Sequence, residues 1–160
     1  MKLLDGPDYY GATIFCDDVR QEVGGKVTLV GMYMDRMFVH GDFPFLLPKF
    51  AMYINCIQRQ RVAKPITKFV IFLPGDEDDK PSIEVLHAPD QMVSLLAEDE
   101  NKMPEHGIIK AHASIMLSPV VFQAPGEVKV RAIIQNDQMI RCGVLPIERH
   151  PSALATPPAG

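Results

Sequence analysis

Apolar and polar residues alternate along several short segments of the chain. The alternation is clearest in residues 109–117, where every second residue is apolar and Lys110, His112 and Ser114 lie between them. Successive side chains of a strand point to opposite faces, so this pattern predicts a half-buried strand. The same period recurs in residues 49–59 and 127–135.

The other predicted strands follow from apolar runs between turn residues. Residues 66–73 are almost wholly apolar, which is typical of a strand covered on both faces. Two glycines in residues 23–26 predict a turn that joins strands 11–18 and 26–35 into a hairpin. Asn136 and Asp137 suit the positive-φ positions of a second tight turn. The remaining strands are predicted in residues 82–87 and 138–147.

These about eight strands, spaced by short connections, favour an antiparallel all-β architecture. We expect a two-sheet antiparallel β-sandwich, immunoglobulin-like in the broad sense, with at most one short helix. Residues 90–98 suit either that helix, capped by Asp90, or a strand, and residues 98–107 are predicted to form a loop. The expected organisation is a flexible arm (1–10), one sandwich domain (11–150) and a proline-rich disordered tail (151–160).

Length and charge narrow the functional classes. The 160 residues suit one domain, and the net charge of −4 gives no support for nucleic-acid binding through bulk positive charge. No apolar run is long enough for a membrane helix, and Asp5 interrupts the only candidate for a signal-peptide core. We therefore expect a cytoplasmic protein that binds neither nucleic acid nor membrane.

The three cysteines, Cys16, Cys56 and Cys142, each lie in an apolar stretch. Their odd number and wide spacing argue against a disulfide framework, and no C-x-x-C pair indicates a metal site. We expect buried free thiols that serve as small apolar side chains.

Other polar motifs also favour structural roles. Gly24, Gly25 and Lys26 lack the spacing of a phosphate-binding loop and lead into a strand. Asp17 and Asp18 would point to opposite faces of a strand, so we expect them to cap its end or to pair with Arg20 or Lys26. None of the five histidines (His40, His87, His106, His112 and His150) forms a metal-binding or catalytic motif.

The acidic turn of residues 76–79 is the sharpest local charge feature. Calcium takes six to eight oxygen ligands, and acidic loops supply them in sandwiches of the C2 type. Here one loop alone is clearly acidic, and Asp42 or Asp99 would have to complete the site. A solvated turn is the favoured interpretation, and a calcium site is the alternative.

Apolar side chains are abundant near the front of the chain. Met32, Met34, Met37 and Met52 suit a core, where methionine fills irregular gaps, although methionine also serves interfaces. Both faces of residues 26–35 are apolar, so one face needs cover from a loop, a helix or another chain.

The proline-bounded connection of residues 42–48 carries four large apolar residues. Alternation places Phe43, Phe45 and Leu47 on one side and Leu46 on the other. They either form a lid on the core or present an apolar patch. We expect Leu47 to anchor the connection and Phe43 or Phe45 to meet a partner. The candidate interaction residues are Phe43, Phe45 and Leu46.

Two stretches resemble known families. Residues 120–147 resemble the closing hairpin of immunoglobulin-like sandwiches, although Val128 stands where those domains often carry tyrosine. The front of the chain resembles a family of small bacterial proteins known only as a domain of unknown function. With the closing hairpin, the resemblance covers about residues 12–147 and implies a bacterial or phage origin without catalytic residues. The matching features at the front are Phe15-Cys16-Asp17, Gly25-Lys26, Val30-Gly31, Phe43-Pro44 and Leu47-Pro48.

The sequence thus predicts a non-enzymatic interaction or structural module, without cofactor or metal, whose partner is another protein or a second copy. A calcium-dependent C2-like binding domain is the alternative. A β-sandwich hydrolase without a recognisable motif is the third hypothesis.

Overall fold

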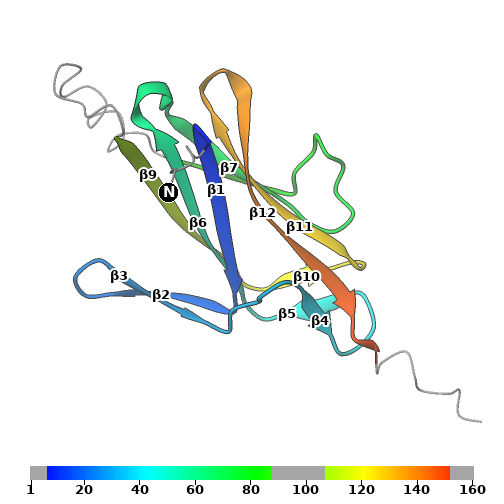
Figure 1. Ribbon diagram of the computed structural model, residues 1–160. Helices are drawn as coiled ribbons and strands as arrows, with labels where there is room; N and C mark the ends of the chain where they lie inside the picture. The colour runs from blue at the N-terminus through cyan, green and yellow to red at the C-terminus, as the bar shows by residue number, and fades with distance from the viewer. Residues whose placement is uncertain (1–6, 88–106, 152–160) are drawn as a thin grey trace, which may run out of the picture.

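The computed structural model describes residues 7–87 and 107–151 of the chain. In this part of the chain there are twelve strands and two short 3-10 turns, and the strands form two main sheets packed face to face (Figure 1). The predicted all-β sandwich is confirmed, but the predicted number of about eight strands is wrong. The predicted helix or strand (90–98), the loop that follows it and most of the tail lie outside the described residues.

The first sheet has three antiparallel strands in the order β1-β6-β9. The long central strand β6 (Phe50–Arg59) pairs along its full length with β9 (Ile108–Leu117). On its other side β6 pairs with β1 (Tyr9–Cys16), which begins two residues earlier than predicted. The alternation in residues 49–59 and 109–117 therefore correctly predicts the strands β6 and β9.

The second sheet has five strands in the order β4-β12-β11-β7-β8. Its centre is the predicted closing hairpin of β11 (Gly126–Ile134) and β12 (Gln138–Arg149). The turn between them is the 3-10 segment η2 (Gln135–Asp137), in which Asn136 and Asp137 have positive φ, as expected. The flanking strands are β7 (Ile66–Phe72), β8 (Ile83–Leu86) and β4 (Met37–Val39), and β4 runs parallel to β12.

Four further short strands form two small antiparallel pairs. The strand β5 (Phe45–Leu47) pairs with β10 (Val120–Phe122) at one end of the sandwich. The strand β2 (Asp18–Glu22) pairs with β3 (Lys26–Val30) as a separate hairpin. Segments of three to five residues are too short to show a clear period, which is why the sequence predicted too few strands.

The hairpin predicted between residues 11–18 and 26–35 is wrong in its first strand. The chain leaves the first sheet at Asp17, whose backbone N–H donates to Val30 O at 2.9 Å. Residues before this point form β1 and pair with β6, whereas residues after it form β2. The predicted strand 11–18 is therefore β1 in all but its last two residues, and β3 pairs instead with β2, whose sequence DVRQE is mostly polar.

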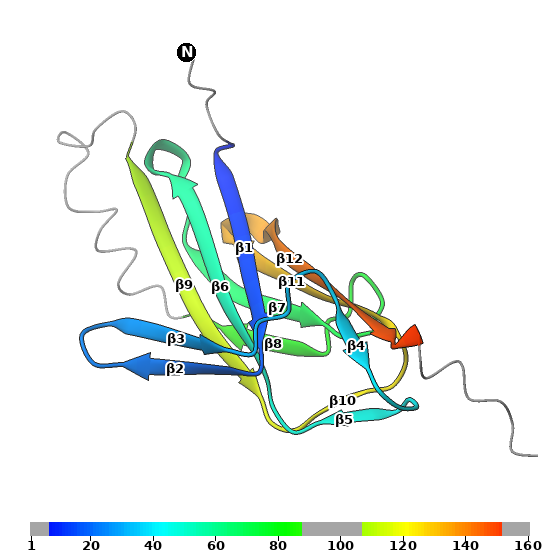
Figure 2. The same ribbon diagram turned by 60° about the horizontal axis from the view of Figure 1, so that its bottom comes forward.

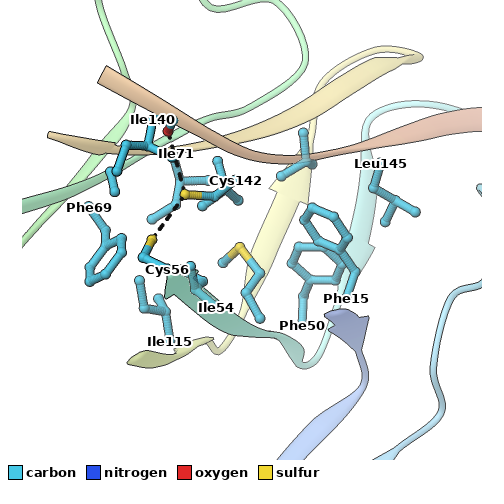
Figure 3. Packing of buried hydrophobic residues seen from close by; sticks show 14 of the residues in the cluster. Phe15, Phe50, Ile54, Cys56, Phe69, Ile71, Ile115, Ile140, Cys142 and Leu145 are labelled. Carbon is cyan, nitrogen blue, oxygen red and sulfur yellow. Dashed lines mark hydrogen bonds between the residues drawn. The ribbon is translucent and has the colours of Figure 1, made fainter. Parts of the chain in front are cut away.

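The main core lies between the two large sheets and is built from their inward-facing side chains (Figure 3). Phe50 is fully buried, stacks on Phe15 at a ring-centre distance of 6.0 Å and meets Phe122 edge-on at 5.7 Å. Full burial of such side chains is the main favourable contribution to folding, at about 2–3 kcal/mol each. The aliphatic layer beside them includes Ile54, Ile71, Ile115 and Leu145.

The strand β7 is covered on both faces, as its apolar sequence predicts. Phe69 and Ile71 belong to the main core, whereas Val70 and Phe72 form a second buried cluster with Ile133 on the outer face. The guanidinium of Arg131 lies 4.5 Å from the ring centre of Phe72, a distance typical of cation–π contacts.

Candidate functional site

The hairpin of β2 and β3 is the most conspicuous projection of the molecule. It extends sideways from one end of the sandwich, past the edge strand β9 (Figures 1 and 2). Gly24 and Gly25 have positive φ in its turn, and Val23 beside them is 96% exposed. We call residues 18–34, which comprise β2, its turn, β3 and the segment that follows, the hairpin arm.

The base of the hairpin arm is tied firmly to the first sheet. The Tyr33 hydroxyl donates to Asp17 Oδ1 at 2.6 Å, and the Tyr33 backbone N–H donates to Phe15 O at 2.9 Å. Burial and this hydrogen bond raise the pKa of Tyr33, so the hydroxyl keeps its proton. Gly31 has φ +67°, and a Cβ there would overlap the Asp17 carboxylate. The arm therefore leaves the sandwich at a fixed angle.

Asp18 links the hairpin arm to the start of β6. Its Oδ2 accepts from Arg20 Nε and its Oδ1 accepts from Lys49 Nζ, both at 3.1 Å. The hydrogen bonds from Arg20 and Lys49 lower the pKa of Asp18. The predicted pairing of Asp18 with Arg20 is confirmed, and the second cation is Lys49 instead of Lys26.

One face of the hairpin arm turns toward the first sheet. Val27 and Leu29 on this face are half-buried, and Gln21 on the same face donates from Nε2 to Ser114 Oγ on β9 at 3.4 Å. The first sheet thus covers part of one of the two apolar faces of residues 26–35.

The other apolar side chains of the hairpin arm remain exposed. Met34 is 87% exposed, Met32 is 49% exposed and Val30 also meets solvent. The prediction that the early methionines belong to the core is confirmed for Met37 and Met52 and wrong for Met32 and Met34. Methionine is flexible and polarisable, which suits it to adaptable interfaces.

The proline-bounded connection of residues 42–48 is half strand and half loop. Phe43 and Phe45 are partly buried and pack on the main core, together with Leu47. Leu46 points outward and is 57% exposed, opposite the exposed Val121 of β10. The alternation within this segment is as expected, and contact of these residues with a partner stays a prediction.

The acidic turn is held by protein donors. Asp76 Oδ2 accepts from the backbone N–H groups of Leu73 and Ser82, and its Oδ1 accepts from Ser82 Oγ, at 2.7–2.8 Å. Burial raises the pKa of Asp76, but the hydrogen bonds from Ser82 and Leu73 outweigh it and lower the pKa. Glu77 pairs with Lys80 within the turn.

Asp78 of the same turn reaches the outer face of the second sheet. It pairs with Lys129 at 3.1 Å and with Arg131 at 3.5 Å, and the hydrogen bond and charge of Lys129 lower its pKa. These residues line a polar groove of about 270 Å³. Asp78 pairs with two cations of the lining, and the other charged lining residues are Glu127 and Arg141.

The described histidines occupy surface and strand positions. His40 and His150 stack at a ring-centre distance of 4.2 Å, and Phe38 meets His150 edge-on. Burial, with a smaller contribution from the charge of His112, lowers the pKa of His87. Within residues 7–87 and 107–151, no three His, Cys, Asp or Glu side chains gather in a way that could hold a metal ion.

Two features of the structure were not expected from the sequence. A groove of about 700 Å³ opens between β1 and β12, with Tyr9, Tyr10 and Met139 in its lining. The thiols of Cys56 and Cys142 meet in the main core. Both features join residues that are far apart in the chain, so no spacing rule could have found them.

Comparison with protein-family models, with curated proteins and with solved structures finds no match for this chain. The described residues include no helix long and apolar enough to cross a membrane. The resemblance to the small bacterial family therefore stays a prediction, and functional inference rests on the geometry of the chain itself.

Proposed function

We propose that the chain is a non-enzymatic interaction module that self-associates through its hairpin arm. One observation carries the proposal: the arm projects from the sandwich while Val23, Val30, Met32 and Met34 remain exposed on it. Large apolar side chains gathered on one segment are more typical of an interaction surface than of free monomer surface.

The strand edges of the hairpin arm also support association. Within the described residues β2 and β3 pair only with each other, so the outer edge of each strand carries backbone groups available to another strand. A two-stranded hairpin gains stability when further strands join it. An exposed strand edge is also a template for pairing with another chain.

A second copy of the chain is the occupant that fits this surface. The exposed charged residues of the arm, Arg20, Glu22 and Lys26, include both signs. A mixed surface of this kind can meet itself about a two-fold axis without a large excess of one charge. Leu46 and Val121 supply a further exposed apolar pair that could widen the contact.

Size-exclusion chromatography with light scattering over a concentration series tests the proposal. We expect the wild-type chain to show a mass above that of the monomer. Met34→Glu should shift the population to the monomer, because a charge at the contact would be desolvated without a partner. Thermal unfolding checks that the variant remains folded.

Met139→Glu is the matched control, because Met139 is an exposed methionine (58%) on β12, away from the hairpin arm. It should leave the measured mass unchanged. A wild-type chain that is monomeric throughout the series would overturn the proposal, as would dissociation caused by Met139→Glu but not by Met34→Glu. Within residues 7–87 and 107–151, no group of side chains that could hold a metal ion favours the calcium-binding alternative.

A further inference from the structure

Two buried thiols face each other across the sandwich. Cys56 lies on β6 of the first sheet and Cys142 on β12 of the second, and their Sγ atoms are 3.4 Å apart (Figure 3). Both side chains are almost wholly buried. Two sulfurs in van der Waals contact, on strands that face each other, are placed for a bond between the sheets.

The third cysteine has different surroundings. Cys16 is also buried, but it lies at the end of β1 beside the hairpin arm, and its thiol donates to Asp18 O at 3.4 Å. No described cysteine faces it. The chain therefore supplies its own internal comparison between a paired and an unpaired buried thiol.

The geometry requires a small movement to form a disulfide. The S–S bond is about 2 Å long, so the two sulfurs must approach by roughly 1.4 Å in total. Side-chain rotation shared between the two residues supplies part of such a shift. The bond would link residues 86 positions apart in the chain, and thus would constrain a long segment of the unfolded state.

The hydrogen bonds of the pair assign different roles to the two sulfurs. Cys142 Sγ donates to Ile140 O at 3.5 Å, which leaves Cys56 to donate its S–H to Cys142 Sγ. The hydrogen bond from Cys56 lowers the pKa of Cys142, and the same bond together with burial raises the pKa of Cys56. Cys142 also lies beside Gly11, which lines the groove between β1 and β12, so the geometry assigns the first step to Cys142.

We propose that Cys56 and Cys142 form an oxidation-sensitive pair that closes into an intramolecular disulfide across the sandwich when the protein meets hydrogen peroxide. In the first step the Cys142 thiolate attacks one peroxide oxygen. The O–O bond breaks, Cys142 becomes a sulfenic acid, and the departing hydroxide takes up the proton that Cys142 released on ionisation to give water.

In the second step the sulfur of Cys56 attacks the sulfur of Cys142. The S–O bond breaks, the S–S bond forms, and the departing hydroxide leaves as a second water with the proton of Cys56. Two thiols are oxidised, and one peroxide is reduced to two waters.

A close approach of β1 covers the pair on the side of the groove. Gly11 lies so near to β12 that a Cβ there would be 2.7 Å from Cys142 Sγ and 2.7 Å from Arg141 O. Gly11 also lines the groove between β1 and β12. The groove thus ends one residue from the reactive sulfur, but even a methyl group would clash there, so peroxide reaches Cys142 only when β1 moves away from β12.

Mass spectrometry after peroxide treatment of the full chain tests the proposal. The protein is treated under native conditions, then unfolded and alkylated. We expect loss of two alkylatable thiols out of three, loss of the mass of two hydrogen atoms, and a cross-linked peptide pair containing Cys56 and Cys142. The melting temperature of the oxidised protein should rise by about 5–15 °C and return on reduction.

Variants separate the pair from the unpaired thiol. Cys56→Ala and Cys142→Ala should each abolish the cross-link, whereas Cys16→Ala should leave it unchanged. If an alanine variant fails to fold, the corresponding serine variant and the wild-type peptide map still decide the question. Oxidation of one cysteine to sulfinic acid without a cross-link, a cross-link that includes Cys16, or no reaction at all would overturn the proposal.

Discussion

Gln58 is the one fully buried polar side chain among the described residues. It continues the inward-facing series of β6, yet its amide forms two hydrogen bonds with the backbone of one residue. Gln58 Nε2 donates to Lys64 O at 3.0 Å, and Lys64 N–H donates to Gln58 Oε1 at 2.9 Å. This pair fastens the chain reversal through η1 (Gln60–Val62), which connects β6 to β7.

Replacing Gln58 with methionine keeps the volume of the side chain and removes both hydrogen bonds. Each such bond contributes about 1 kcal/mol net, and a backbone group left without a partner costs about 1–3 kcal/mol. Lys64 is only partly buried, so water can reach its backbone in the variant. We therefore expect Gln58→Met to lower the free energy of unfolding by about 2 kcal/mol.

Urea denaturation and thermal unfolding measure this loss, which corresponds to a fall in melting temperature of roughly 4–8 °C. Gln138→Met is the matched control, because Gln138 is exposed and accepts a hydrogen bond from Lys64 Nζ at 2.7 Å through its side chain. That variant should stay within about 0.5 kcal/mol of the wild type. A Gln58→Met variant as stable as the control would refute the importance assigned to the buried amide.

Two further predictions concern the acidic turn and the proline-bounded connection. Asp76→Ala should lower the free energy of unfolding by about 1–3 kcal/mol at neutral pH, because three donors lose their acceptor. Folding lowers the pKa of Asp76, so its carboxylate stabilises the protein fully above the unfolded pKa of about 4. The difference in unfolding free energy between wild type and variant should therefore disappear as pH falls through the folded pKa. A difference that is independent of pH would contradict this prediction. Phe45→Ser should lower the free energy of unfolding by about 2 kcal/mol in thermal or urea denaturation, because the ring packs on the core. Leu46→Ser should change this free energy by no more than about 0.5 kcal/mol, because Leu46 is exposed. Equal losses in the two variants would contradict the difference in packing.

The parts of the fold that the sequence predicts correctly are those with a local signal. The alternation around His112 reports β9 because its neighbours on one face are buried and those on the other meet solvent. Positive φ at Asn136 and Asp137 follows from the tolerance of these residue types for that conformation. In each case the physical cause acts between residues a few positions apart.

The features that sequence reasoning missed depend on contacts between distant residues. β1 pairs with β6 because Asp17 and Gly31 turn the chain out of the first sheet, and nothing local distinguishes this arrangement from a hairpin. Cys56 and Cys142 meet because two strands face each other across the sandwich. The exposure of Met34 likewise depends on the hairpin arm leaving the sandwich, which no hydrophobic pattern specifies.

The parallel pairing of β4 with β12 constrains how the protein is made. Met37, Phe38 and Val39 pair with Ile147, Glu148 and Arg149, so β4 finds its neighbour only after all the intervening strands have been synthesised. β11 likewise needs β12 before the centre of its sheet is complete. During synthesis the nascent chain must therefore keep strongly apolar strands such as β7 without their final cover, and contacts of such long range fold slowly. We expect the second sheet to complete its folding only after β12 has been synthesised, and the growing chain to depend on protection from aggregation until then.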